Sequence, residues 1–187
     1  MVSLQENAPT PRSFQEFAWT SSQHLLCSNE LYERPMNEIR KKIRVGVIGG
    51  SKPDASSRQL AFKVGKLIAE KDAILVCGGL SGVMEAASRG AKQAGGLTLG
   101  ILPGNNPSDA NPFIDVPLAT GLGYARNSLV AMNSDVLIAV DGAYGTHSEI
   151  AYGMIYGKKV IGLGTWTIEG VIPVKTAEDA VKLAIGS

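Results

Sequence analysis

The hydrophobic and polar positions of the chain follow two alternating patterns from about residue 43 onward. Short aliphatic and β-branched runs predict buried parallel strands, and between them apolar residues recur three and four positions apart, as on one face of a helix. The first run, residues 43–48, ends in Gly49-Gly50-Ser51, as a strand before a tight turn does. Leu60, Val64 and Leu67 then mark a helix. This strand-helix unit repeats along the chain.

The repeats predict the remaining elements and the fold class. Further strands are expected at 73–77, 97–102, 113–118, 136–140 and 160–163, with an edge strand at 171–174. Further helices are expected from residue 83 to a glycine stop at Gly95-Gly96, at 124–132, at 148–156 and from a Thr176 cap to about 185. Strands that alternate with helices imply right-handed crossovers and helices on both faces of the sheet. We therefore predict an α/β fold with a doubly wound, mainly parallel, Rossmann-like sheet in three layers.

Residues 1–40 have a different composition from the rest. Gln, Asn, Ser, Thr and Pro are prominent there, and neither helical nor strand periodicity is sustained. We expect a polar N-terminal extension, peripheral or flexible, followed by a Rossmann-like nucleotide-binding domain at 41–187. Met36 stands shortly before the first strand, so translation could also begin there.

Composition narrows the classes of partner. The 187 residues suffice for one core, and 18 Lys and Arg balance 17 Asp and Glu, which disfavours nucleic acid or an anionic membrane as a partner. Cys27 and Cys77 are too few for a disulfide framework. No run approaches the roughly 18 apolar residues of a membrane span, and no signal-peptide core precedes the domain. A cytoplasmic protein with a small-molecule partner is predicted.

Three glycine turns are the candidate binding loops. Each follows a predicted strand and precedes a helix, and in doubly wound folds ligands bind beyond the carboxyl ends of the strands. A glycine also closes any tight turn without a ligand, so a single turn would carry little weight. The third turn is the best phosphate candidate, because amides at a helix start and the Thr146 hydroxyl can hold an anion. The three turns are Gly49-Gly50-Ser51, Gly78-Gly79-Leu80-Ser81-Gly82 and Gly142-Ala143-Tyr144-Gly145-Thr146.

Several common chemistries lack their sequence signature. There is no P-loop, no Gly-x-Gly-x-x-Gly after the first strand, and no acidic residue for a ribose after the second. His24 and His147 belong to no cluster with metal-ligand spacing, so no metal site is predicted. No Gly-x-Ser-x-Gly elbow supports a serine nucleophile. Met84 is most simply a core residue, and His147 lies beside the third turn.

Three segments together resemble the Lonely Guy superfamily. They are Gly78-Gly79-Leu80-Ser81-Gly82-Val83-Met84, Arg126 with Asn127, and the run from Asp141 to Glu149 with its Gly-x-x-Gly-Thr-x-x-Glu core. That superfamily includes cytokinin riboside 5'-monophosphate phosphoribohydrolases, proteins mislabelled as lysine decarboxylases, and molybdenum cofactor carrier proteins. The segment 121–127 looks closer to the carrier subgroup, while the hydrolase signature has Pro and Gly where this chain has Asp141 and Ala143.

The resemblance implies a set of site residues. If catalysis is retained, Glu149 would support the positive charge of N-glycosidic cleavage, and Arg126 would assist the departing base or fix the phosphate. From the residues alone, the simpler interpretation is preferred: Glu149 is a carboxylate favoured at a helix start, and Arg126 is a solvated cation on a helix face. An Asp141 carboxylate beside the cradle would weaken anion binding unless it points away, pairs with a cation or holds a metal. The expected ligand-binding residues are Gly49, Gly50, Ser51, Gly78, Gly79, Gly82, Asn127, Gly142, Ala143, Tyr144, Gly145 and Thr146.

Two functions from different classes follow. The first is a carrier that holds a nucleoside monophosphate or a pterin-phosphate such as molybdenum cofactor unchanged. The second is a nucleoside 5'-monophosphate phosphoribohydrolase that releases a free base and ribose 5-phosphate, so whether the chain is an enzyme stays open. A DNA-processing protein of related fold is a weaker third. The family's members commonly form homodimers or larger homo-oligomers, and the helix Ile150 to Tyr156 faces either a partner subunit or the core.

Overall fold

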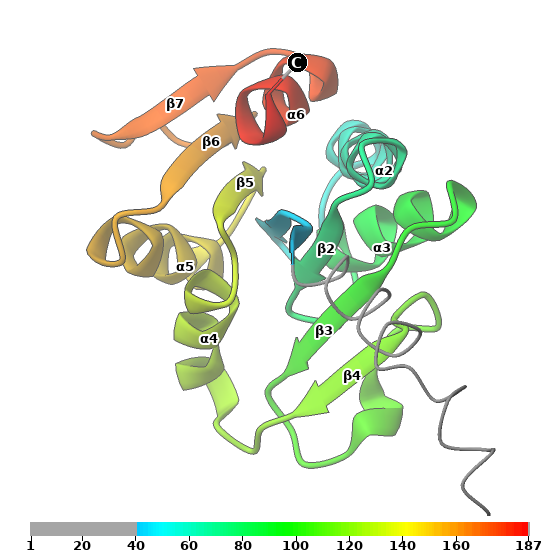
Figure 1. The fold of residues 1–187 in the computed structure, drawn as a ribbon. Helices are drawn as coiled ribbons and strands as arrows, with labels where there is room; N and C mark the ends of the chain where they lie inside the picture. Colours follow the sequence, from blue (N-terminus) through cyan, green and yellow to red (C-terminus); the bar gives the residue numbers. More distant parts are fainter. Residues whose placement is uncertain (1–40, 187) are drawn as a thin grey trace, which may run out of the picture. The chain divides into compact units, whose positions relative to one another are not determined.

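Seven strands pair in one parallel sheet in the structure, a computed structural model that describes residues 41–186 (Figure 1). Their order across the sheet is β4-β3-β2-β1-β5-β6-β7, and every neighbouring pair is parallel. The strands are β1 (Arg44–Gly49), β2 (Ile74–Cys77), β3 (Thr98–Leu102), β4 (Val116–Ala119), β5 (Val136–Val140), β6 (Lys159–Leu163) and β7 (Val171–Val174).

The helices cover both faces of the sheet. One face packs against α2, α3 and α6, and the other packs against α4 and α5. These helices are α2 (Ala55–Glu70), α3 (Val83–Gln93), α4 (Asn127–Met132), α5 (Tyr144–Ile155) and α6 (Ala177–Ile185). The predicted three-layer, doubly wound α/β fold is therefore confirmed. The proposed extension at 1–40 and the alternative start at Met36 lie outside the described residues.

The order in which the chain adds strands to the sheet reverses between β1 and β5. The chain builds β2, β3 and β4 outward on one side of β1, and β5, β6 and β7 on the other. Gly49 at the end of β1 is level with Val140 at the end of β5. The loops after these two strands therefore leave the sheet side by side, which is where ligands bind in this fold class.

Two elements begin later or earlier than their sequence pattern predicts. The helix expected at 148–156 begins earlier, at Tyr144. Gly145 therefore lies in the first turn of the helix and not in a loop before it; the amides of a first turn have no intrahelical hydrogen bonds to lose. The strand expected at 113–118 begins at Val116, because the Phe113 carbonyl accepts a hydrogen bond from Thr98 Oγ1 instead of continuing the ladder. In the described part of the chain, no helix is long and apolar enough to span a membrane.

Helices α2 and α3 pack backbone against backbone through two glycines. A Cβ on Gly65 would collide with the Ala87 carbonyl oxygen, and a Cβ on Gly90 would collide with the Phe62 carbonyl oxygen. Both obstacles are backbone atoms, which cannot turn aside as a side chain can. The spacing of these helices therefore depends on two residues without side chains.

Gly65→Ala should destabilise the protein by about 2 kcal/mol or more, because overpacking outweighs the gain of about 1 kcal/mol in helix propensity. The free energy of unfolding from urea titrations, followed by circular dichroism, measures this change. Gly104→Ala is the matched control, since a Cβ there would meet only the flexible Asp109 side chain at 3.3 Å. Equal stability of the Gly65 variant and the natural chain would contradict the packing described.

Candidate functional site

A cavity of about 250 Å³ lies at the carboxyl edge of the sheet, between the ends of β1 and β5, where the strand order reverses. The loop after β1, the start of α3, the start of α4 and the first turns of α5 form its walls. Its lining residues are Gly49, Gly50, Ser51, Leu80, Met84, Tyr124, Arg126, Asn127, Ala143, Gly145, Thr146 and Glu149. The cavity thus combines backbone-rich loops with a few buried polar side chains.

The N-terminus of α5 presents amides to this cavity without a side-chain cap. Ala143 occupies the cap position and has no oxygen to offer, whereas Asp54 caps α2 and Thr176 caps α6. Thr146 Oγ1 accepts a hydrogen bond from the Ala143 amide at 3.4 Å. The first-turn amides therefore keep their donors free, and the helix dipole adds positive potential at the same place. Such a helix start favours an anion.

Arg126 and Glu149 form a buried ion pair in the wall of the cavity. Their residues are 6% and 5% exposed, and Arg126 Nη1 lies 3.4 Å from Glu149 Oε1. Nη1 also donates to Asn127 Oδ1 at 2.5 Å, and Nη2 donates to the Gly78 carbonyl at 3.2 Å. The buried Nε has no partner among the described residues. One guanidinium donor is thus still available in a place where water has little access.

Burial sets the protonation of this pair. Burial raises the pKa of Glu149 from 4.5 to about 7, and the attraction of Arg126 only partly opposes that shift. Burial likewise lowers the pKa of Arg126, while Glu149 raises it. A carboxyl group with a pKa near neutrality can donate or accept a hydrogen bond under physiological conditions. The site therefore contains a permanent cation beside a group that exchanges a proton.

Asn127 and Gly78 hold the pair in position. Asn127 Nδ2 donates to Ser148 Oγ at 2.8 Å and to the Gly145 carbonyl at 3.3 Å, which ties the start of α4 to α5. A Cβ on Gly78 would collide with Arg126 Nη2 and approach Met84 Sδ to 2.7 Å. The absence of a side chain at Gly78 makes room for the guanidinium.

The structure brings together one group of the expected site residues and leaves another outside the cavity. The residues that line it are Gly49, Gly50, Ser51, Asn127, Ala143, Gly145 and Thr146, with Arg126 and Glu149. The expected ligand residues that do not line it are Gly78, Gly79, Gly82, Gly142 and Tyr144. A Cβ on Gly82 would meet the Ser51 Cα at 2.6 Å, and Tyr144 is 93% exposed. Gly82 thus serves the close approach of two loops.

Three apolar residues line the cavity and were absent from the sequence-based site. Leu80 and Met84 follow the second glycine turn, and Tyr124 begins the segment before Arg126. Met84 is only 8% exposed, so its predicted core position is compatible with a place in the wall. Tyr124 is 88% exposed. Their position beside glycine turns was the available signal, but apolar residues are ordinary there.

Asp141 lies beside a different hollow. It lines a space of about 220 Å³ with Gly142, Gly164, Thr165 and Trp166, none of which lines the larger cavity. Its φ of 53° is left-handed. His147 packs on Trp166, with ring centroids 3.8 Å apart, and does not line the larger cavity either. Within residues 41–186, no three His, Cys, Asp or Glu side chains gather as a metal site would require.

Comparison with known proteins gives the family. The model of the SLOG cluster4 family matches residues 42–185, almost the whole described part of the chain. The chain belongs to the SLOG cluster4 family. An uncharacterized protein of Archaeoglobus fulgidus is 45% identical over 148 residues, which cover 79% of this chain and 97% of that protein.

Other relatives connect this SLOG cluster4 member to the superfamily predicted from its motifs. A probable cytokinin riboside 5'-monophosphate phosphoribohydrolase of Oryza sativa subsp. japonica is 35% identical over 112 residues. That match covers 57% of this chain and less than half, 46%, of the rice protein. The resemblance to the Lonely Guy superfamily is confirmed.

Solved structures of molybdenum cofactor proteins have the same fold. The molybdenum cofactor binding protein of Rippkaea orientalis is 35% identical, with a TM-score of 0.73, over 76% of this chain and 95% of that one. The molybdenum cofactor carrier protein of Chlamydomonas reinhardtii is 34% identical, with a TM-score of 0.70, over 79% and 100%. These neighbours and the rice relative place the SLOG cluster4 chain among ligand-binding Rossmann-like proteins.

The buried Glu149 should make stability fall as the pH rises. Between its ordinary pKa of 4.5 and its folded pKa of about 7, the folded state binds more protons than the unfolded state. The free energy of unfolding should therefore decrease across this window, by up to about 3 kcal/mol, and stay level above it. Urea titrations at a series of pH values measure this change.

Glu149→Gln should remove this pH dependence, because a neutral amide has no proton to lose. The stability of the variant relative to the natural chain should rise from low to high pH. Glu169→Gln, which removes an exposed carboxylate, is the control and should run parallel to the natural chain. A parallel curve for the Glu149 variant would contradict the assigned burial.

Proposed function

We propose that this protein is a carrier for a phosphate-bearing ligand, either a nucleoside monophosphate or a pterin-phosphate such as molybdenum cofactor. The observation that carries the proposal is the uncapped start of α5 facing a cavity that also contains a buried guanidinium. In this proposal the phosphate accepts hydrogen bonds from the first-turn amides of α5 and from Thr146 Oγ1. Arg126 supplies the cationic side chain among the residues that line the cavity.

The apolar wall of the cavity supports a ligand with a ring. Leu80 and Met84 offer apolar surface across from the polar α5 start, and ligand sites typically combine such surface with a few polar groups. The volume of about 250 Å³ lies just below the usual range of about 300–1,000 Å³. We infer that one mononucleotide-sized ligand binds, with part of it left at the mouth beside Tyr124.

The backbone after β5 favours carriage over hydrolysis. The hydrolase signature would put a proline at position 141, and proline requires a φ near about −65°. Asp141 instead has a φ of 53°, so this chain follows a path that the hydrolase signature cannot adopt at that position. Its carboxylate also belongs to the separate hollow, which relieves the expected conflict with a phosphate.

The phosphoribohydrolase remains the alternative function, and one observation favours it. Arg126 and Glu149, the two residues that the hydrolase resemblance assigns to catalysis, both line the cavity. In that reading, ionised Glu149 stabilises the positive charge at the anomeric carbon while water attacks, and Arg126 binds the phosphate or the leaving base. With a pKa of about 7, Glu149 would need a pH near or above neutrality to act as an anion.

The outward face of α5 bears on the proposed assembly of the protein. In α5, Ile150 is 1% exposed, while Ile155 is 73% exposed. Tyr152 and Tyr156 stack with centroids 6.1 Å apart and pack against the core, so they are half-buried and leave Ile155 as the outward apolar residue. We keep a homodimer or larger homo-oligomer, and a cytoplasmic location, as proposals.

Carriage predicts a retained ligand. Native mass spectrometry of freshly purified protein should show a bound phosphate-bearing compound, which extraction and fragmentation would identify. Thr146→Val should lower the occupancy of the ligand about tenfold. Valine has nearly the shape of threonine but lacks the hydroxyl that would donate a hydrogen bond to the charged phosphate. Thr176→Val, at the cap of α6 far along the chain, is the control and should keep the ligand. Loss of ligand from both variants, or none in the natural chain, would contradict the proposal.

Hydrolysis predicts turnover instead of retention. Incubation with a panel of nucleoside 5'-monophosphates should leave each nucleotide intact if the protein is a carrier. If free base appears, Arg126→Ala and Glu149→Gln should each reduce its release by at least about a hundredfold. Release that these variants share with the natural chain would identify a contaminating enzyme.

A further inference from the structure

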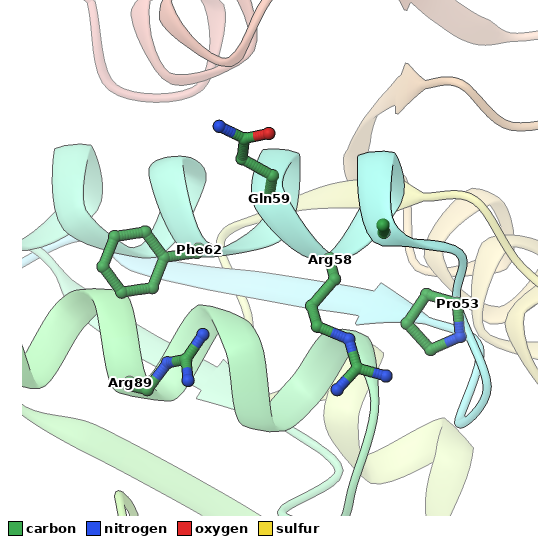
Figure 2. Close-up of a pocket in the computed structure, with 6 residues that line it drawn as sticks. Pro53, Arg58, Gln59, Phe62 and Arg89 are labelled. Atoms are coloured by element: carbon green, nitrogen blue, oxygen red, sulfur yellow. The ribbon is translucent and has the colours of Figure 1, made fainter.

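An open groove runs between α2 and α3, outside the ligand cavity (Figure 2). Its volume is about 480 Å³, and its lining residues are Pro53, Ala55, Arg58, Gln59, Phe62 and Arg89. Figure 2 shows Arg58 extending from α2 toward α3, and Arg89 extending from α3 to the neighbourhood of Phe62. Two guanidinium groups therefore reach the same groove from opposite helices.

These two arginines carry the charge of the groove, because no carboxylate of the described residues forms an ion pair with either. The nearest carboxylate at the start of α2, Asp54, accepts a hydrogen bond from the Ser57 amide at 2.6 Å and so serves as the helix cap. By contrast, the lysines on the same two helices that form ion pairs do so with Glu178, Glu70 and Asp115. The groove is a cationic strip on a nearly neutral chain.

Phe62 gives this strip an apolar floor and orients one of its cations. The guanidinium carbon of Arg89 lies 5.3 Å from the centroid of the Phe62 ring. An arginine that stacks on a ring uses the face of its guanidinium and leaves the N–H edge free to bind a carboxylate in a forked geometry. Arg89 is thus held ready for an anionic partner at a lower cost in side-chain entropy than a freely rotating cation.

The shape of the groove favours a protein segment over a small molecule. Small ligands are usually enclosed by their site, whereas Ala55, Arg58, Gln59 and Arg89 are all exposed here. Only Pro53 is buried and Phe62 half-buried. A groove between two helices with an apolar floor and charged rims suits an extended or helical segment with acidic and apolar side chains.

We propose that this groove docks an acidic segment of a partner protein, with its carboxylates on Arg58 and Arg89 and an apolar side chain on Phe62. The groove begins at Pro53, two residues beyond Ser51, which lines the ligand cavity. A partner bound there therefore stands next to the loop after β1. This places the partner beside one wall of the ligand cavity.

The test uses the full chain and a short labelled peptide of glutamate and leucine, with a glutamine and leucine peptide as the neutral comparison. Fluorescence anisotropy should show binding of the acidic peptide that weakens with added salt, and weaker binding of the neutral one. The double variant Arg58→Gln/Arg89→Gln should raise the Kd about tenfold. Lys71→Gln/Lys175→Gln removes the same charge from exposed positions outside the groove and should leave the Kd unchanged.

Charge reversal makes the test independent of general stickiness. Arg58→Glu/Arg89→Glu should lose the acidic peptide and bind a lysine and leucine peptide instead. Equal effects of the groove and control variants would overturn the proposal. So would tight, Arg58- and Arg89-dependent binding of a single-stranded oligonucleotide that excludes the peptide, because the groove would then bind nucleic acid. Ligand occupancy, measured on the same variants, separates failure here from failure of the proposed carrier function.

Discussion

The pairing of β1 with β5 is the constraint on which the rest of the site depends. These two strands are adjacent in the sheet although 86 residues lie between Gly49, the last residue of β1, and Val136, the first residue of β5. Their parallel register delivers the Gly49–Ser51 loop and the start of α5 to one edge at one level. Without that register, the uncapped amides of α5 would face open solvent instead of the cavity.

The buried ion pair of Arg126 and Glu149 lowers the stability of the fold and is held by several hydrogen bonds. Removing both charges from water is unfavourable, and the rise in the pKa of Glu149 shows that Arg126 does not fully offset that cost. Neighbouring polar groups reduce it: the Gly78 carbonyl, Asn127 and, through Asn127, Ser148. A network of this kind is retained at a price in stability, which is common where a site must bind or exchange charge.

Much of the fold could be predicted from the sequence. Its strands are continuous aliphatic runs, which are easy to recognise, and glycines mark the turns that follow them. Fewer details of the site could be predicted. Gly145 indicated a loop, yet it lies in the first turn of α5. The amides there have no intrahelical acceptor, so a glycine destabilises the helix less than it would in the interior. Gly78 indicated a ligand loop, but its environment shows a space-making role that depends on Arg126, 48 positions away. The path of Asp141 was also beyond reach, since a sequence pattern carries no information about one left-handed φ.

The close approach of Arg126 to Gly78 has a consequence for the history of this fold. Any side chain at position 78 would occupy the present space of the guanidinium, so a change at this position acts on Arg126 as well. A descendant that gains even a methyl group there must shift or lose the arginine, and with it the counterion of Glu149. Evolution at position 78 is therefore coupled to the placement of the arginine, and a side chain there would reach the charge balance of the pocket through Arg126.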